Sequence, residues 1–255
     1  MKITVVTPVF NAASTIASNI ESVLRQTYRN VEHIIVDGGS LDATVAVIQK
    51  FDDPRLVWIS EKDGGIYDAI NKGIRMSTGD VVCFLCADDL YANNTVLEKI
   101  AEAFEKNRGK DIVYGDIVYV NKHDLTKVER YWKSRPFKPG LFRKGWLPPN
   151  TALFIKSAVL KHHELFSLRY KLAADFELQY RLFEQHRLNT LYVPGILVKM
   201  RNGGASNASL RSMFNSLREC YAILRHHGVR FPLVYIINTI FYRMKQLFIP
   251  SHVHF

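Results

Sequence analysis

Short apolar runs alternate with amphipathic stretches through the first 120 residues of the chain. The runs predict buried β-strands, whereas apolar residues that recur every three or four positions predict helices. The expected strands cover residues 2–6, 31–36, 56–60, 81–85 and 112–120, and the expected helices cover residues 14–26, 42–50, 66–76 and 94–106. This alternation predicts an α/β fold in which a mostly parallel central sheet is flanked by helices, with right-handed crossovers.

The alternation stops after residue 120. The elements expected beyond it are a turn at 121–124, a strand at 128–132, a loop at 136–150, a strand at 151–155, a helix at 175–185, short strands at 191–193 and 197–200 around the turn Pro194-Gly195, and a long helix at 210–227. We therefore divide the chain into a first half (residues 1–120), a second half (121–206) and a basic helical C-terminal region (207–255).

The loops at the carboxyl ends of the first four strands are where a ligand of a parallel sheet binds. These loops are residues 7–13, 37–42, 61–65 and 86–90, and three of the four carry carboxylates, which predicts one shared site. The first loop, T-P-V-F-N-A-A, has no glycine, and no G-x-x-x-x-G-K-[ST] run occurs in the chain. NAD-dependent enzymes and P-loop NTPases are therefore disfavoured.

Asp88 and Asp89 directly follow the fourth apolar run. Two adjacent carboxylates at the end of a buried strand repel each other unless a cation or hydrogen-bond donors compensate them. Mn²⁺ and Mg²⁺ prefer oxygen ligands and keep substrate phosphates in their shell, so this pair predicts a metal site for a diphosphate. The alternative is that the pair caps the helix that follows.

Two glycine-containing loops carry the other candidate ligand-binding residues of the first half. Asp37 can accept a hydrogen bond from a base or a ribose, and Ser40 can contact the same ligand or cap the next helix. Asp63 and Gly65 precede a helix whose N-terminus favours an anion, and glycine lets backbone approach a ligand closely. Turn glycines with capping residues are the alternative for both loops.

The helix expected at residues 66–76 has a polar side formed by Tyr67, Asp68, Asn71 and Lys72. These residues lie opposite part of the apolar stripe, on the side that could face a bound nucleotide. A solvated helix face is the alternative, and it fits Asn71 and Lys72 in particular.

Asp175 opens the helix expected in the second half, within A-A-D-F-E-L. A carboxylate at a helix start is a common cap. Transfer of a sugar with inversion, however, needs a general base on the face opposite the leaving diphosphate. Asp175 is the acid of the second half that is best placed for this role.

The motifs T-P-V-F-N, V-D-G-G-S-L-D, S-E-K-D-G-G-I-Y-D-A-I-N-K-G-I, S-T-G-D with A-D-D, and A-A-D-F-E-L occur in this order between residues 1 and 206. Together they resemble a family 2 inverting glycosyltransferase, of the type found in bacterial exopolysaccharide, capsule and O-antigen assembly, such as the colanic acid transferases. The resemblance implies the GT-A fold over residues 1–206. It also implies a nucleotide-sugar donor, usually linked to UDP, and a divalent metal, Mn²⁺ or Mg²⁺.

The resemblance also assigns roles to individual residues. Pro8, Asp37 and Asp63 are expected to contact the nucleoside, Asp88 to bind the metal with help from Asp89, and Asp175 to act as the general base. The predicted donor-binding residues are Pro8, Phe10, Asn11, Asp37, Ser40, Asp63, Gly65, Asp68, Asn71, Lys72 and Ala87.

Three positions depart from the family pattern. Cys86 stands where the first acid of the D-x-D element is usual, and Gly38 replaces the second acid of D-D-G-S. Asn150-Thr151 stands in place of a frequent His-Gln on the acceptor side. These differences bear on metal binding and acceptor contacts and leave the expected fold unchanged.

The basic charge of the chain is concentrated near its C-terminus. The net charge is +10, and the segment from Lys199 onward holds eight Lys and Arg residues and a single acid, Glu219. Arg211, Arg218 and Arg225 recur every seven residues, which predicts a basic stripe on a helix with Phe214, Leu217, Tyr221 and Leu224 on its apolar side. Such a helix favours an anionic membrane surface; core packing with a homo-oligomer interface is the alternative.

The three cysteines and an N-terminus without a leader-like apolar core indicate a reducing compartment. We therefore expect a cytoplasmic enzyme at the inner face of the cytoplasmic membrane, using a saccharide or polyprenyl-diphosphate-linked acceptor. A nucleotidyltransferase is the alternative activity, although the first loop lacks the basic, glycine-rich sequence that it needs. A non-catalytic basic surface-binding protein is a further alternative, and no nucleic-acid-binding motif is present.

Overall fold

The computed structural model describes residues 1–203 and 210–247, and it describes side chains for residues 1–203 and 211–241. Its strands are β1 Ile3–Val9, β2 Val31–Asp37, β3 Leu56–Ser60, β4 Val81–Phe84, β5 Leu90–Tyr91, β6 Ile112–Val120, β7 Val128–Trp132, β8 Leu153–Lys156 and β9 Thr190–Arg201. Its α-helices are α1 Ile16–Leu24, α2 Thr44–Ile48, α3 Ile66–Met76, α4 Val96–Lys106, α5 Ser157–His162, α6 Ala174–Tyr180, α7 Leu210–His226 and α8 Pro232–Leu247.

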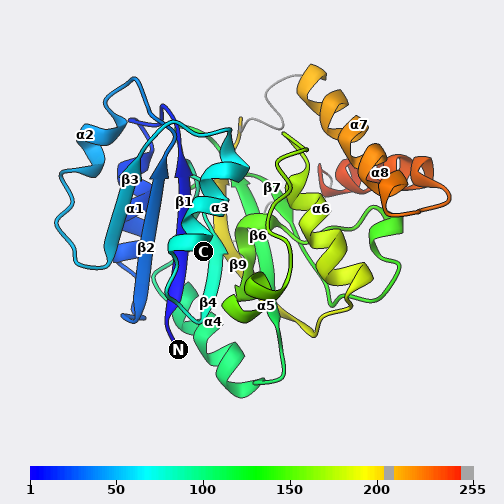
Figure 1. The fold of residues 1–255 in the computed structure, drawn as a ribbon, viewed down its shortest axis with the longest axis horizontal. Coiled ribbons are helices and arrows are strands. Elements are labelled where there is room, and N and C mark those ends of the chain that lie inside the picture. Colours follow the sequence, from blue (N-terminus) through cyan, green and yellow to red (C-terminus); the bar gives the residue numbers. More distant parts are fainter. Residues whose placement is uncertain (204–209, 248–255) are drawn as a thin grey trace.

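Within the described residues the strands form one sheet in the order β3-β2-β1-β4-β8-β6-β9-β5, with β7 paired to β6. The pairs among β1, β2, β3 and β4 are parallel, as is the pair of β6 and β9, whereas β8, β5 and β7 run antiparallel to their neighbours. Helices lie along both faces of the sheet (Figure 1). The predicted α/β fold with a mostly parallel, helix-flanked sheet is confirmed.

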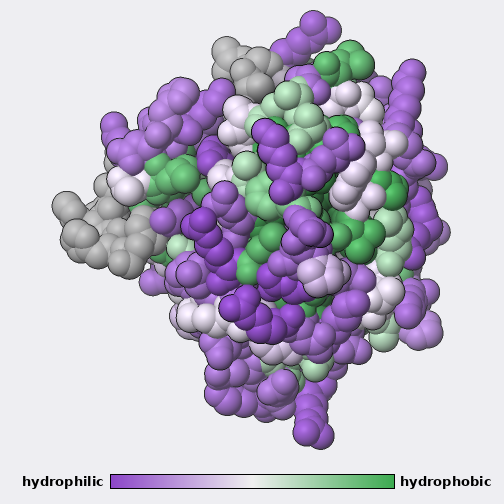
Figure 2. All heavy atoms as spheres, turned by 90° about the vertical axis from the view of Figure 1, so that its left-hand side faces the viewer, coloured by the Kyte–Doolittle hydropathy of each residue, from purple (hydrophilic) through white to green (hydrophobic). Residues whose placement is uncertain are grey.

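Burial explains which segments became strands. Every residue of β1, β2 and β6 is buried, as expected for strands covered by helices on both faces. Edge strand β3 is partly exposed, with Val57 43% accessible. Figure 2 views this end of the molecule, where apolar residues reach the surface among hydrophilic ones.

Helix α3 is held against the sheet by a close approach to β1. A Cβ added at Gly73 would lie 2.3 Å from Cγ1 of Val6, so only glycine allows this spacing. Ala69, Ile70 and Ile74 bury the same side of the helix. The N-terminus of α3, at Ile66, is thereby fixed beside the carboxyl end of β1.

Several boundaries differ from the prediction. The two short strands expected around Pro194-Gly195 are one continuous strand, β9, because register shifts against β6 absorb the irregular residues. The helix expected at 175–185 is α6 followed by a π-helical turn, Arg181–Gln185. Strand β5 and helix α5 were not predicted, since two and six residues are too short to show a period.

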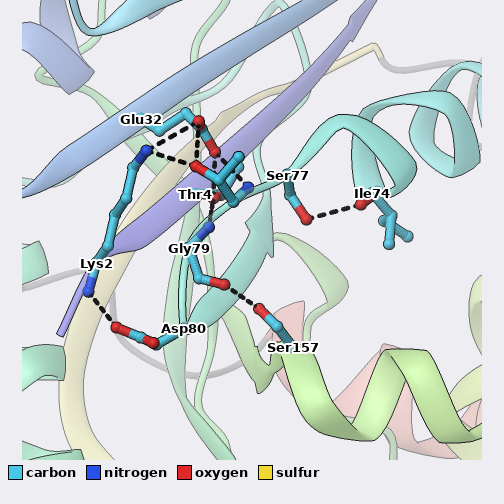
Figure 3. A network of polar contacts seen from close by, with 9 residues as sticks. Lys2, Thr4, Glu32, Ile74, Ser77, Gly79, Asp80 and Ser157 are labelled. Atoms are coloured by element: carbon cyan, nitrogen blue, oxygen red, sulfur yellow. Dashed lines mark hydrogen bonds and ion pairs between the residues drawn. The ribbon is translucent and has the colours of Figure 1, made fainter.

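A network of polar contacts ties together the amino ends of β1, β2 and β4 (Figure 3). Glu32 accepts hydrogen bonds from Lys2 Nζ, Thr4 Oγ1, and both the backbone N–H and Oγ1 of Thr78. Ser157 closes the network by donating to the carbonyl of Gly79. This end of the sheet is therefore fastened by side chains that satisfy one another.

Helices α7 and α8 pack against each other and against the rest of the chain, at the end of the molecule opposite β3 (Figure 1). Cys220, Ile223 and Leu224 form the buried side of α7. Phe214 and Tyr221 are exposed, so the apolar side predicted for this helix is only partly correct. In the described part of the chain, no helix has the length and apolar character needed to cross a bilayer.

Candidate active site

A cavity of about 930 Å³ opens at the carboxyl ends of β1, β4 and β6. Its walls bring together residues from the first half of the chain, from the segment 145–151, from α6 and from both C-terminal helices. Nine of the predicted site residues line it: Pro8, Phe10, Asn11, Asp63, Gly65, Ala87, Asp88, Asp89 and Asp175. The predicted shared site at this edge of the sheet therefore exists as a single space.

The acidic pair forms the polar floor of the cavity. The ligand atoms of Cys86, Asp88 and Asp89 lie within 4.8 Å of one another. Asp89 is 1% exposed, yet neither of its carboxylate oxygens has a hydrogen-bond partner within the described residues. A buried carboxylate without donors is costly, so this one calls for a cation that the chain itself does not supply.

The electrostatics of the pair agree with this geometry. Burial, together with the charge of Asp88, raises the pKa of Asp89 well above its ordinary value. Burial also raises the pKa of Asp88, against the opposing charge of Arg201. Burial keeps the Cys86 thiol protonated by raising its pKa well above the ordinary value, which leaves oxygen as the dominant ligand type. A hard divalent ion such as Mn²⁺ or Mg²⁺ fits this donor set.

Two residues that the sequence analysis did not single out hold the acidic loop. Asn19, buried in α1, donates from Nδ2 to the carbonyls of Cys86 (2.8 Å) and Asp89 (2.9 Å). Arg201, at the end of β9, donates to the carbonyl of Asp88 (2.5 Å) and to Ser18 Oγ (2.9 Å). The signal for Asn19 was present, because an amide stands on the helix face otherwise formed by Ile16, Ile20 and Val23.

Asp175 lies in the first turn of α6 and lines the same cavity. Its Oδ1 accepts hydrogen bonds from the hydroxyl of Tyr67 (3.1 Å) and from its own helix, through the backbone N–H of Phe176 (2.8 Å). Burial, followed by the charge of Asp175, raises the pKa of Tyr67 well above its ordinary value, so this hydroxyl remains a donor. Tyr67, on the polar side of α3, thus orients the carboxylate of the candidate base.

The loops after β1, β2 and β3 meet on the other side of the cavity. Phe10 is 59% exposed there, and Asn11 has a positive φ of 50°. Asp63 accepts the backbone N–H of Gly65 at 2.8 Å. A Cβ added at Gly38 would lie 2.5 Å from Oδ2 of Asp63, so the carboxylate of Asp63 occupies the space that a side chain at position 38 would need.

Five predicted donor-binding residues do not line the cavity: Asp37, Ser40, Asp68, Asn71 and Lys72. Asp37 is fully buried and accepts hydrogen bonds from Gly39 N–H, from the N–H and Oγ of Ser40, and from Ser60 Oγ. Its carboxylate is therefore occupied by its own loop. In the structure Asp37 and Ser40 shape that loop, and their expected contact with the ligand stays a prediction.

The three α3 residues of this group make comparable internal contacts. Asp68 accepts the N–H of Gly64, and Lys72 forms an ion pair with Glu61 at 2.8 Å. Asn71 exchanges two hydrogen bonds with the backbone of Phe166, at 2.8 and 3.0 Å. The exchange joins α3 to the segment that leads toward α6.

Sequence comparisons identify the family. The family model described as Glycosyl transferase family 2 matches residues 4–167. A PGL/p-HBAD biosynthesis glycosyltransferase of Mycobacterium bovis is 27% identical over 221 residues, covering 82% of this chain and 81% of that protein. An uncharacterized glycosyltransferase of Mycobacterium tuberculosis is 33% identical over 177 residues, covering 69% of this chain and 66% of that protein.

Solved glycosyltransferases share the fold. A mannosyltransferase from Pyrobaculum calidifontis in complex with GDP-Man and Mn²⁺ has a TM-score of 0.67 at 16% identity, covering 93% of this chain and 69% of that one. S. aureus TarS 1-349 in complex with UDP has a TM-score of 0.64 at 16% identity, covering 88% and 65%. The chain spans 39% of a longer TarS chain.

These likenesses agree with the motifs quoted from the sequence and with the arrangement of the sheet. The solved structures confirm the GT-A fold, and the family model covers well over half of the chain. The chain belongs to glycosyl transferase family 2.

Proposed function

We propose that the protein transfers a sugar, with inversion, from a UDP-linked donor to a saccharide or polyprenyl-diphosphate-linked saccharide acceptor in cell-surface polysaccharide assembly. The observation that carries this proposal is the single cavity that contains both the uncompensated acidic pair and Asp175. Relatives of the same fold support the donor class, since TarS binds UDP and UDP-GlcNAc and the Pyrobaculum enzyme binds GDP-Man with Mn²⁺.

The donor would be held between the loops after β1 and β3 and the acidic pair. Phe10 offers an exposed aromatic ring on which a base can stack, and Asp63 offers a carboxylate to a base or a ribose hydroxyl. Asp88 and Asp89 would hold the divalent ion. When bound, such an ion neutralises charge on the diphosphate leaving group.

The acceptor hydroxyl would lie between Asp175 and the anomeric carbon of the donor. The carboxylate of Asp175 takes the hydroxyl proton while the acceptor oxygen bonds to the anomeric carbon. The bond from that carbon to the diphosphate oxygen breaks, and the diphosphate leaves with the electron pair. Tyr67 donates a hydrogen bond to Oδ1 of Asp175 and so helps to orient the carboxylate toward its proposed task.

The far part of the cavity is suited to a saccharide. Thr151 and Thr239 both line it, are 5% and 6% exposed, and have hydroxyl oxygens without a partner in the described structure. Apolar side chains, among them Leu147 and Tyr235, form the walls around them. The hydroxyls of a sugar ring can form hydrogen bonds with the two threonines, and its apolar C–H faces can pack against the apolar walls.

A thermal-shift panel tests the donor and the metal together. We expect UDP to raise the melting temperature of the wild-type protein more with Mn²⁺ than without it. Asp88→Asn should lose the metal-dependent part. A shift with GDP or dTDP in place of UDP would change the donor assignment, and a shift that ignores Mn²⁺ in both proteins would contradict the metal assignment.

Replacement of Asp175 tests the base. Asp175→Asn keeps the shape and the hydrogen bond to Tyr67 but cannot take a proton. We expect turnover to fall by about 10³-fold while the UDP-dependent thermal shift is retained. Unchanged turnover of the variant would show that another group accepts the proton.

The proposal places the enzyme at the inner face of the cytoplasmic membrane, bound to anionic lipid through α7 and α8. Apolar side chains at spacings of one, three and four residues form an exposed face on α8: Leu233, Val234, Ile237, Ile240 and Phe241, each 45–63% accessible. On α7, exposed residues alternate between arginine and aromatic: Arg211, Phe214, Arg218, Tyr221 and Arg225. Apolar area combined with basic charge matches an anionic bilayer.

Cosedimentation with vesicles tests the surface. The wild type should pellet with phosphatidylglycerol vesicles and much less with phosphatidylcholine vesicles, and the double variant Leu233→Ser/Ile237→Ser should bind about tenfold more weakly. Leu41→Ser, which removes a leucine that is 90% exposed at the β3 end, is the matched control. Equal binding by all three proteins, or dimerisation that only the double variant loses, would contradict a lipid partner.

A further inference from the structure

Glu219 is the single acid among the residues from Lys199 onward, and it stands on α7 beside arginine. Its carboxylate accepts hydrogen bonds from three consecutive backbone N–H groups. Oε1 accepts from Lys171 at 3.1 Å, and Oε2 accepts from Leu172 at 2.8 Å and Ala173 at 2.9 Å. Glu219, the single acid of this basic region, therefore binds a backbone segment that lies almost fifty residues earlier in the sequence.

That segment is the start of helix α6. Ala173 is the N-cap residue of α6, and its methyl side chain cannot accept a hydrogen bond from the first turn. A helix start normally takes such an acceptor from a Ser, Thr, Asp or Asn at this position. Glu219 does not bond the N–H groups of the first turn; it holds the three residues that lead into the helix, and its negative charge lies near the positive end of the helix dipole.

Asp175 lies two residues beyond Ala173, in the same turn. Its carboxylate is oriented by Tyr67 on one side and by the backbone of α6 on the other. Because α6 has no cap of its own, the position of its first turn depends on the contact with α7. The same face of α7 reaches the cavity, since Ser216 and Cys220 line it together with Asp175.

We propose that Glu219 is a positioning residue for the reaction, which holds residues 171–173 and thereby aims Asp175 at the acceptor. The inference rests on the proposed role of Asp175 as the base. It makes α7 part of the catalytic unit, although this helix lies beyond the residues matched by the family model.

Steady-state kinetics on Glu219→Ala and Glu219→Gln test the proposal on the full-length protein. We expect kcat to fall by about tenfold or more in Glu219→Ala, while the donor KM and the shift with UDP and Mn²⁺ stay as in the wild type. Glu219→Gln should recover part of kcat, because its carbonyl oxygen still accepts hydrogen bonds. Hydrogen exchange of amides 171–173 should become faster in Glu219→Ala.

The matched control is Asp111→Ala. Asp111 also holds a loop by accepting a backbone N–H, that of Asn189, but it lies at the amino end of β6. Its loss should lower stability and leave kcat per folded enzyme unchanged. A Glu219→Ala variant with faster exchange at 171–173 and wild-type kcat would have only a structural role, and that result would overturn the inference.

Asp175→Asn, assayed in parallel, separates the two levels of the argument. If Asp175→Asn is inactive and Glu219→Ala is fully active, the positioning role alone fails. If Asp175→Asn retains turnover, the base assignment fails, and the role of Glu219 fails with it. Loss of donor binding in Glu219→Ala would likewise overturn the inference, since it would place the defect on the donor side.

Discussion

Two buried carboxylates stand at opposite ends of the same sheet and are treated in opposite ways. Glu32, at the amino end, is 8% exposed and accepts four hydrogen bonds, including one from the Lys2 ammonium (Figure 3). Asp89, at the carboxyl end, is 1% exposed, and neither oxygen of its carboxylate has a hydrogen-bond partner within the described residues. Both carboxylates are therefore buried, and they differ in the number of hydrogen-bond donors that surround them.

Their pKa values respond accordingly. Burial would raise the pKa of Glu32, but hydrogen bonds from the backbone of Thr78 and from Thr4 outweigh it and hold that pKa below its ordinary value. For Asp89 burial is not outweighed, and the pKa is raised well above the ordinary value. A buried acid that the fold satisfies stabilises the fold, whereas one that the fold leaves open is available to a ligand.

The largest effect expected from this contrast is on activity. Asp88→Asn and Asp89→Asn should each lower metal-dependent turnover by about 10³-fold, because the ion's charge stabilisation is worth several kcal/mol. Glu32→Gln should leave turnover per folded enzyme unchanged. Assays across a range of Mn²⁺ concentrations check this. An Asp89→Asn enzyme that is as active as wild type at low Mn²⁺ would contradict a role for Asp89 in metal binding and so the contrast with Glu32.

The second effect is on stability. Here the replacement of Glu32 should have the larger effect and the replacement of Asp89 the smaller one. Glu32→Gln should lower the free energy of unfolding by about 2–3 kcal/mol, since it weakens a buried network and leaves the Lys2 charge without its partner. In metal-free protein, Asp89→Asn should not lower it, because no hydrogen bond is lost. Urea titrations of the two variants in EDTA measure both values, and equal destabilisation would contradict the comparison.

A smaller effect tests how the loop that carries Asp89 is held in place at the carboxyl end of the sheet. Asn19→Ala removes both donors to the loop that carries Asp89, while the metal ligands remain. We expect the apparent affinity for Mn²⁺ to fall by about tenfold, as for other residues that orient metal ligands. The thermal shift against Mn²⁺ concentration measures it. Asn93→Ala, at an exposed turn before α4, serves as the control and should keep the affinity.

The last effect is a pH dependence of stability that arises from a buried histidine near the amino end of the sheet. Burial lowers the pKa of His33 from 6.5 to about 3, so the folded protein keeps this imidazole neutral. The unfolded chain binds the proton first, and stability should fall as the pH drops below about 6.5, by about 1.4 kcal/mol per unit. His33→Gln should flatten this slope between pH 6.5 and 5. An unchanged slope in the variant would assign the acid sensitivity to other groups.

The sequence predicted several strands and helices of residues 1–132 closely because their signals are local. Strands β3, β6 and β7 and helix α3 have the predicted bounds, and the acidic pair lies where strand β4 led us to expect. Contacts between distant segments carried no such signal. Asn19, Arg201 and Glu219 act through backbone groups far away in sequence. No spacing along the chain reveals that a carboxylate on α7 holds the segment that leads into α6. For the same reason the hydrogen bonds that Asp37 accepts from Ser40 and Ser60 were not foreseen, and its expected ligand contact stays a prediction.

The glycine at position 38 has a consequence for engineering the donor site. Its lack of a side chain first looked like the loss of one acid from the loop. The geometry shows that the carboxylate of Asp63 lies in the space that a side chain at position 38 would enter. An acid introduced at position 38 would therefore require the side chain of Asp63 to move from its present position.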